Sequence, residues 1–271
     1  MSKKRLDVLL VERNLAPTRE KAKRLIMAGL VFSNEMRLDK PGMKIDEQIP
    51  LKVKGKDIPY VGRGGLKLKR ALTTFSIDVH EKIMVDVGSS TGGFTDCALQ
   101  NGVRLSYAVD VGYNQLDWRL RNNERVIVME RTNFRYVTKE MFEGAFPNFA
   151  SIDVSFISLT LIFPVLKTIL QNKSEIVALV KPQFEAGRDQ VGKKGIVRDK
   201  KIHLDVLKRI VKFAKDEQYQ LFGLTFSPIT GGNGNIEFLL HLGWNNDERE
   251  EQIMDDSFII NVVEEAHTTL K

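Results

Sequence analysis

The chain has 271 residues, of which 42% are hydrophobic, enough for one sizeable core and a second small domain. Its single cysteine, Cys97, excludes a disulfide framework and a zinc cluster, and we expect it to pack as a small apolar side chain. The N-terminal residues MSKKRLD lack the apolar segment of a signal peptide, and no run of residues is long and apolar enough to span a membrane. We therefore expect a cytoplasmic protein with no membrane partner.

Positive charge is concentrated in the first quarter of the chain. The formal net charge is +6, but residues 1–70 contain 18 Lys and Arg against 8 Asp and Glu, whereas residues 71–271 contain 23 against 27. A net charge of +10 in one part and −4 in the other favours a nucleic-acid-binding module joined to a domain with another task. The alternative is a basic surface that only faces solvent.

The N-terminal residues show the pattern of two helices followed by a strand. Four leucines between residues 6 and 15 form one apolar face, and Ala16-Pro17 ends the first helix. Thr18 is expected to cap the second helix and Gly29 to end it. Four basic residues of that helix present a broad positive surface suited to RNA phosphates. The candidate RNA contacts are Arg5, Arg19, Lys21, Lys23, Arg24 and Arg63.

The stretch KVKGKDIPYVGRGG, residues 52–65, is rich in glycine and lysine. Such a composition is typical of a connection between domains. We place an N-terminal RNA-binding domain at residues 1–58, a linker at 59–65 and a second domain from residue 66.

The stretch VDVGSSTGGFTD, residues 85–96, predicts a strand, a tight glycine turn and a helix. Two familiar phosphate-binding motifs are excluded, because Phe94 stands where a P-loop needs lysine and Ser90 stands where a dinucleotide fingerprint needs glycine. The pattern that remains is D-x-G-x-x-x-G-G. In this pattern we expect Asp86 to face a cationic or hydrogen-bond-donating part of a ligand.

Polar residues also end the next two strand-like runs. Asp110 ends LSYAVD, 22 residues after Gly88, where an acid can bind ribose hydroxyls, and Asn133 ends RVIVMERTN. A ligand with a ribose, a cationic group and no phosphate fits S-adenosylmethionine. The alternative is a glycine turn whose neighbouring acids only serve the fold. The candidate cofactor contacts are Asp86, Gly88, Ser89, Ser90, Gly92, Gly93, Phe94, Asp110, Asn133 and Asp153.

Further strand-like runs at residues 149–154, 175–180, 220–226 and 236–242 are accompanied by helical stretches at 159–171 and 199–217. Strands that alternate with helices predict a parallel α/β sheet. The short connection SPITGGNGN predicts a hairpin, so the final strand should be antiparallel. By analogy, a seven-stranded sheet of this kind is the Rossmann-like architecture of class I methyltransferases. We assign it to residues 66–245 and expect a helical extension at 246–271.

Four charged residues lie at or near the ends of predicted helices and strands in this second domain. Lys67 begins the helix after Arg63-Gly64-Gly65, and Asp153 and Lys181 end two successive strands. Glu237 lies on the last strand. Because open α/β sheets bind ligands at the carboxyl ends of their parallel strands, these residues are candidates for catalysis. A buried lysine is costly unless it is paired, so Lys181 should pair with Asp153 or Glu237.

Two resemblances follow from these residues. Arg5-Leu6-Asp7, Thr18-Arg19-Glu20-Lys21-Ala22, Gly29-Leu30-Val31 and Ile45 resemble the alpha-L RNA-binding motif, first known from a small-subunit ribosomal protein. Arg-Leu-Asp is also a catalytic signature of pseudouridine synthases, but here it opens the module, so we interpret Asp7 as structural. The whole chain resembles the TlyA family, through RGGLKL, DVGSSTGGFTD, AVDVG, DVSFISL, VKPQFE, GKKGIVRD and GNIEF.

The TlyA resemblance implies an S-adenosylmethionine-dependent enzyme that methylates the 2′-hydroxyl of a cytidine ribose in ribosomal RNA, which we expect within ribosomal subunits. Lys67, Asp153, Lys181 and Glu237 resemble the K-D-K-E set of FtsJ-type ribose methyltransferases. A ribose hydroxyl is a weak nucleophile, and a lysine can accept its proton only if burial or a neighbouring cation lowers the lysine pKa. Lys181 is the candidate base. We predict no metal site.

Two other functions stay open on the sequence alone. The name haemolysin, carried by members of this family, suggests a membrane-active protein, and a non-catalytic RNA-binding protein could retain the same fold. The glycine-rich basic stretch GRDQVGKKGIVR, residues 187–198, is either a loop that closes over RNA or a plain surface loop.

Overall fold

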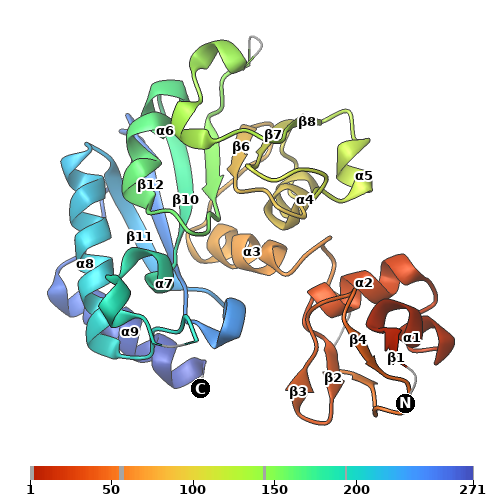
Figure 1. Cartoon of the computed structure of the whole chain (residues 1–271). Helices are drawn as coiled ribbons and strands as arrows, with labels where there is room; N and C mark the ends of the chain where they lie inside the picture. Colours follow the sequence, from red (N-terminus) through yellow and green to blue (C-terminus); the bar gives the residue numbers. More distant parts are fainter. Residues whose placement is uncertain (1–2, 55–57, 143–144, 193, 271) are drawn as a thin grey trace. The chain divides into compact units, whose positions relative to one another are not determined.

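In the computed structural model the chain forms two compact units, Met1–Gly65 and Leu66–Lys271 (Figure 1). The structure describes residues 3–54, 58–142, 145–192 and 194–270. Helix α3 (Gly64–Thr74) already begins at Gly64, so the end of the segment predicted as a linker is helical. Residues 55–57 lie outside the described part of the chain.

The N-terminal unit packs two helices, α1 (Leu6–Glu12) and α2 (Arg19–Met27), around a core of buried leucine, isoleucine, valine and alanine side chains. Thr18 accepts the Lys21 backbone N–H at 3.1 Å, which confirms the predicted cap. Helix α1 ends at Glu12, before the predicted Ala16-Pro17 break, and Asn14 turns the chain with a φ of +57°. Two small antiparallel sheets complete the unit: β1 (Lys3–Arg5) with β4 (Lys44–Asp46), and β2 (Val31–Ser33) with β3 (Met36–Arg37) and β5 (Lys52–Val53).

Asp7 has a structural role in this unit, as its place in the module suggested. Its carboxylate is fully buried and receives hydrogen bonds from Arg5 at 2.9 and 3.0 Å and from Arg19 at 3.0 Å. Hydrogen bonds from Arg5 outweigh burial and lower the pKa of Asp7 to about 2. Both arginine side chains nevertheless remain about half exposed, at 45% and 52%.

We expect Asp7→Asn to destabilise the N-terminal unit by about 2 kcal/mol, because hydrogen bonds to a charged group are lost. Hydrogen exchange of the α1 and α2 amides in the full chain would measure the loss. The exposed Asp39→Asn substitution is the control and should leave exchange unchanged. Equal protection in both variants would contradict the structural role of Asp7.

The second unit is built on one seven-stranded sheet with the order β11-β12-β10-β9-β6-β7-β8. All neighbouring pairs are parallel except those of β12, which runs antiparallel to both β10 and β11. The predicted fold class, including the antiparallel last strand, is confirmed. The strands are β6 (Ile83–Val87), β7 (Leu105–Val109), β8 (Val126–Met129), β9 (Phe149–Ile152), β10 (Ser174–Val180), β11 (Gln220–Phe226) and β12 (Phe238–Trp244).

Helices cover both faces of this sheet. Figure 1 shows α3, α4 (Gly93–Gln100) and α5 (Trp118–Arg121) on one side. On the other side lie α6 (Phe163–Ile169), α7 (Pro182–Glu185), α8 (Lys200–Asp216) and α9 (Asp256–Thr269). The predicted C-terminal extension therefore contains a helix, α9, whose apolar residues belong to the same core as the sheet.

The β6–α4 turn explains the small residues of VDVGSSTGGFTD. Gly88 has a φ of +84°, and a Cβ atom there would lie 2.7 Å from the Asp153 carbonyl oxygen. Gly92 has a φ of +91°, and a Cβ atom there would lie 2.2 Å from Leu120. The chain itself therefore approaches these glycines, from the end of β9 and from α5.

Asp86 does not face a ligand, contrary to the prediction. The residue is fully buried. One carboxylate oxygen accepts the Thr95 N–H at 3.1 Å and the Thr95 hydroxyl at 2.7 Å, and the other accepts the Ser151 hydroxyl at 2.7 Å. Asp86 thus ties the first turn of α4 to β9 from inside the unit. Burial raises its pKa to about 6 despite the hydrogen bonds from Thr95 and Ser151.

Because the pKa of Asp86 is higher in the folded state than the ordinary 3.8, its contribution to stability is present at low pH and is lost as pH rises through about 6. Relative to Asp86→Asn, which does not titrate, the wild type should lose about 2 kcal/mol of unfolding free energy between about pH 4 and pH 6, out of about 3 kcal/mol over the whole titration. Denaturant unfolding at several pH values measures this difference. Asp247→Asn, at an exposed position, is the control, and a constant difference across this range would refute the assignment.

Candidate active site

A cavity of about 320 Å³ opens at the carboxyl ends of β6, β7, β8 and β9. Half of the predicted cofactor residues line it: Gly88, Ser90, Asp110, Asn133 and Asp153. The other half do not line it: Asp86, Ser89, Gly92, Gly93 and Phe94. Ser89 and Phe94 are buried, and Gly92 serves the close approach of α5, so these residues shape the turn behind the cavity wall.

Asp110 lies on the cavity wall at the end of β7. Its two carboxylate oxygens accept the backbone N–H groups of Ser90 at 2.8 Å and Gly112 at 2.7 Å. These bonds fix the carboxylate, and each oxygen retains a lone pair that can accept a hydrogen bond from a hydroxyl group of a ligand. Asn133 is held in a similar way, since its side-chain oxygen accepts the Arg135 N–H at 3.1 Å.

Much of the remaining lining was not predicted from the sequence. It consists mostly of apolar side chains with a few hydroxyl and amide groups, at the end of β7 and in the segments that follow β7, β8 and β9. These residues are Val109, Val111, Gln115, Thr132, Phe134, Val154, Ser155, Phe156, Ile157 and Ile162. Their sequence signal is only that they follow strand ends. An acid beside apolar walls fits the ribose and the adenine ring of S-adenosylmethionine.

The four predicted catalytic residues lie together beside this cavity. Lys67 Nζ is 2.6 Å from Glu237 Oε2 and 3.8 Å from Asp153 Oδ2. Lys181 Nζ is 2.5 Å from Asp153 Oδ1 and donates a hydrogen bond to Ser155 Oγ at 3.0 Å. Asp153 is therefore the predicted carboxylate partner of Lys181, and it joins both lysines to the cavity that it lines.

The electrostatics of this group depend on burial and close pairing. The side chains of Lys67, Lys181 and Glu237 are at most 10% exposed. Burial raises the pKa of Asp153, but the ammonium groups of Lys67 and Lys181 outweigh burial and hold this pKa below its ordinary value. Two ammonium groups thus face two carboxylates, and each charge has a partner of opposite sign.

Two neighbouring residues complete the surroundings of Glu237. Gln183 Nε2 donates a hydrogen bond to Glu237 Oε1 at 3.3 Å. Gly231 makes room for the carboxylate, because a Cβ atom at that position would lie 2.0 Å from Glu237 Oε1. Neither residue was predicted, because their proximity to Glu237 depends on the return of the chain from β11 to β12.

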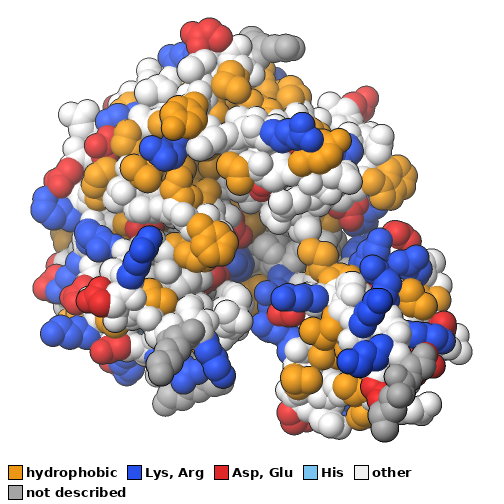
Figure 2. Space-filling view, in the orientation of Figure 1, with side chains coloured by type: hydrophobic (Ala, Val, Ile, Leu, Met, Phe, Trp, Pro, Cys, Tyr) orange, Lys and Arg blue, Asp and Glu red, His pale blue; other side chains and the backbone are white. Residues whose placement is uncertain are grey.

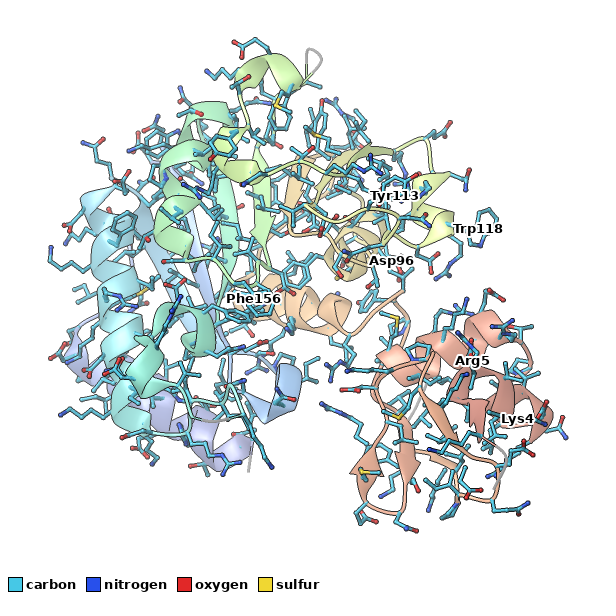
Figure 3. The ribbon with its side chains drawn as sticks, in the orientation of Figure 1. Lys4, Arg5, Asp96, Tyr113, Trp118 and Phe156 are labelled. Atoms are coloured by element: carbon cyan, nitrogen blue, oxygen red, sulfur yellow. The ribbon has the colours of Figure 1, made fainter. Side chains whose placement is uncertain are left out.

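Phe156 is the most exposed aromatic side chain near the four catalytic candidates. It lines the cavity, is 90% exposed and has a φ of +62°, in the left-handed region that non-glycine residues seldom adopt. Its ring lies 4.8 Å from that of Phe184, and Lys181 Nζ lies 5.8 Å from the Phe184 ring centroid. Figure 3 shows Phe156 on the near face of the second unit.

The predicted RNA contacts belong to the N-terminal unit. Lys21 and Arg24 lie on α2 beside Tyr60, and Lys23 Nζ is 3.7 Å from Glu20. Arg63 lies beside Gly29, where a Cβ atom would be 3.4 Å from its guanidinium. Together with Arg5 and Arg19, these residues give the unit the basic side chains that RNA phosphates require.

The basic loop at 187–198 is described except for Lys193. Its second half is tied to the β11–β12 connection, because Asn235 accepts the Val197 N–H at 3.0 Å and donates to the Gly195 carbonyl at 2.9 Å. Within the described ranges, no three or more His, Cys, Asp or Glu side chains group as metal ligands do. None of the described helices is both long and apolar enough to cross a membrane.

Comparison with known proteins shows the relationship of the chain. Residues 60–244 match the family described as FtsJ-like methyltransferase, and residues 4–48 match the S4 domain family. The chain is 67% identical to "Putative rRNA methyltransferase YqxC" of Bacillus subtilis (strain 168), covering 99% of this chain and 96% of that protein. It is 42% identical to "Hemolysin A" of Brachyspira hyodysenteriae, covering 88% and 98% of the two proteins. It is 39% identical to "16S/23S rRNA (cytidine-2'-O)-methyltransferase TlyA" of Mycobacterium tuberculosis, covering 90% and 91%.

Two solved structures resemble this chain over long stretches. A structure described as "Putative hemolysin from Streptococcus thermophilus" is 53% identical, with a TM-score of 0.78, and the match covers 99% of this chain and 97% of the other. A hemolysin structure from Lactococcus lactis, named with the same qualifier, is 51% identical with a TM-score of 0.72, covering 77% and 98%. The chain therefore belongs to the TlyA, or haemolysin A, family of S-adenosylmethionine-dependent rRNA methyltransferases, which join an S4 RNA-binding domain to an FtsJ-like methyltransferase domain.

Proposed function

We propose that the protein transfers the methyl group of S-adenosylmethionine to the ribose 2′-hydroxyl of a cytidine in ribosomal RNA. The observation that carries this proposal is the group formed by Lys67, Asp153, Lys181 and Glu237. Asp153, which contacts both lysines, also lines the cavity. The choice of cytidine is supported by the names of the relatives from Mycobacterium tuberculosis and Campylobacter jejuni, which are 39% and 38% identical.

The lining of the cavity fits the cofactor in chemistry. Asp110 is held by two backbone N–H groups where it can accept hydrogen bonds from ribose hydroxyls, and Val109, Val111 and Ile162 offer apolar walls for an adenine ring. S-adenosylmethionine supplies an electrophilic methyl group on a sulfonium. The remaining requirement is a nucleophile aligned with that methyl group and a group that accepts its proton.

Lys181 is the proposed proton acceptor. Lys67 lies against two carboxylates, whereas Lys181 lies against Asp153 and a neutral hydroxyl. When Lys181 is neutral, the Lys67 ammonium still faces both carboxylates, and the group carries a net charge of −1. Lys67 can then orient the ribose or hold the adjacent phosphate, while Glu237 and Asp153 orient the lysines. Phe156 exposes its ring beside this group, and we propose that the target base stacks on it.

A ribose target accounts better for these residues than a base target does. Methylation at C5 of a pyrimidine requires a nucleophilic cysteine, but Cys97 is buried within α4 and does not line the cavity. Methylation of an exocyclic amine is typical of a [DN]-P-P-[YF] motif after the fourth strand, where this chain has Asp153-Val154-Ser155-Phe156.

Removal of the proposed base tests the reaction. We expect Lys181→Ala to lower kcat by about 10² to 10⁴, the range for general-base catalysis, while cofactor binding is retained. The assay supplies labelled S-adenosylmethionine and ribosomal subunits that lack the modification, and then digests the RNA to nucleosides. Lys173→Ala, at a lysine with a 62% exposed side chain, is the matched control.

Label in 2′-O-methylcytidine that is lost in Lys181→Ala and kept in Lys173→Ala would support both the reaction and the base. Label in a nucleobase would refute the ribose mechanism. A cytidine product formed equally well by Lys181→Ala would refute only the role of Lys181.

Glu185 is a proposed positioning residue behind this site. Its buried carboxylate accepts the Leu159 N–H at 2.8 Å and the Ser158 hydroxyl at 2.7 Å. These bonds join α7, which follows Lys181, to the loop that carries Asp153, Ser155 and Phe156. Loss of this connection should loosen the alignment of the two catalytic segments.

We expect Glu185→Ala to lower kcat about tenfold, on the scale of misplaced catalytic groups. Glu185→Gln should recover most of the activity, because its amide oxygen can still accept the Leu159 N–H. Steady-state kinetics with separate titrations of cofactor and RNA would distinguish kcat from KM. Equal losses in the two variants would argue against a positioning role.

A further inference from the structure

Exposed aromatic and apolar side chains gather on the methyltransferase unit beside the cofactor cavity. Val111 is 70% exposed, Tyr113 64%, Trp118 66% and Tyr136 70%. Tyr113 follows β7, Trp118 begins α5 and Tyr136 ends the 3-10 helix η1 (Phe134–Tyr136). Figure 3 shows Tyr113 and Trp118 near one another at the right of this unit, with Phe156 closer to its centre, and Figure 2 shows hydrophobic and basic side chains next to one another on the same face.

Arginine guanidinium groups accompany two of these rings. The Arg131 guanidinium lies 4.2 Å from the Tyr113 ring centroid, and the Arg135 guanidinium lies 5.7 Å from that of Tyr136. Both arginines are exposed. Within the part of the chain that the structure describes, neither has a carboxylate at ion-pair distance. Their charge is therefore available to an anionic partner.

The composition of residues 111–136 also favours an anionic partner. All five cationic residues between 111 and 136 are arginine, and none is lysine: Arg119, Arg121, Arg125, Arg131 and Arg135. A guanidinium stacks on flat rings and binds phosphate oxygens in pairs, whereas an ammonium acts as a point charge. Arg119 and Arg121 are already paired with Asp117 and Glu130, and Arg125 donates a hydrogen bond to the Val103 carbonyl at 3.3 Å, so the anion-binding capacity is assigned to Arg131 and Arg135.

This surface is fixed to the wall of the cofactor cavity. The Arg131 N–H donates to the Gly112 carbonyl at 2.9 Å, and the Thr132 N–H donates to the Asp110 carbonyl at 2.9 Å. Val111 and Thr132, the neighbours of these rings and arginines in sequence, line the cavity itself. A chain segment bound across Tyr113 and Arg131 would thus lie next to the cofactor cavity, at the wall that carries Asp110.

We propose that Tyr113, Trp118, Tyr136, Arg131 and Arg135 form a second RNA-binding surface, which stacks unpaired nucleotides next to the target in the chain. Proteins bind single-stranded nucleic acid by base stacking on exposed aromatic rings combined with cationic groups along the backbone. Protein–protein interfaces are also rich in aromatic residues and arginine, but the S4 domain of this chain and its family of rRNA methyltransferases favour RNA as the occupant. This inference rests on the proposed function, because it assumes that the RNA substrate reaches the cavity.

The test compares Tyr113→Ala and Trp118→Ala with Ile253→Ala, a substitution at a 79% exposed apolar residue that precedes α9. We expect each aromatic substitution to weaken binding of ribosomal subunits about tenfold, as for the loss of one base–ring stack. The KM for RNA should rise more than kcat falls, and S-adenosylmethionine affinity should stay unchanged. Ile253→Ala should match the wild type in all three measurements.

The charge of the surface is tested separately by salt dependence. Arg131→Gln should reduce the slope of log K against log salt by about one, whereas Lys212→Gln, at a 76% exposed side chain on α8, should not. Binding is measured without cofactor, so it can be read even if methylation of the chosen RNA fails. Methylation by variants that bind like the wild type would overturn this inference while leaving the proposed function intact. A change in self-association alone, seen by sedimentation, would also overturn it in favour of a protein interface.

Discussion

The ion pairs of the Asp153 carboxylate are the interactions on which the candidate active site depends. This carboxylate pairs with Lys181 at 2.5 Å and lies 3.8 Å from Lys67, and it also lines the cofactor cavity. Two lysines held this close and this far from water would repel each other without a shared anion, so removing one partner of such a group leaves an uncompensated buried charge. The four charges therefore have to come together as a set, from α3, β9, β10 and the connection before β12.

Sheet topology brings these elements to one place. The parallel pairing of β10 with β9 aligns Ala178 with Ile152, so Lys181 and Asp153 both follow their strands at the same carboxyl-terminal edge of the sheet. Glu237 precedes β12 and would lie at the opposite end if that strand were parallel. Because β12 is antiparallel to β10 and pairs Phe238 with Val180, its beginning meets the end of β10. The reversed strand is thus what places the second carboxylate beside Lys67.

The sequence predicted the parts of this arrangement that leave a local pattern. β11 has the predicted bounds, residues 220–226, because apolar runs between turn residues specify buried strands. The strand-end residues Asp153 and Lys181 were predicted for the same reason. The orientation of Asp86 was not predicted, because an acid beside glycines can either face a ligand or be buried in the fold. Here it receives hydrogen bonds from Thr95 and Ser151 inside the fold. Exposed aromatic residues such as Phe156 and Tyr113 lie in loops, whose place at the cavity depends on tertiary structure.

The two units differ in the way that they can attract RNA. Residues 1–65 contain 15 Lys and Arg against 8 Asp and Glu, whereas residues 66–271 contain 26 against 27. Long-range attraction to RNA therefore comes from the N-terminal unit, and it weakens as salt screens the phosphates. The methyltransferase unit is nearly neutral, so its net charge contributes little to RNA binding. Its binding to RNA therefore has to come from local contacts. Stacking on rings next to exposed guanidinium groups meets that requirement, because base–ring stacking does not depend on net charge and acts only on nucleotides that are already unpaired.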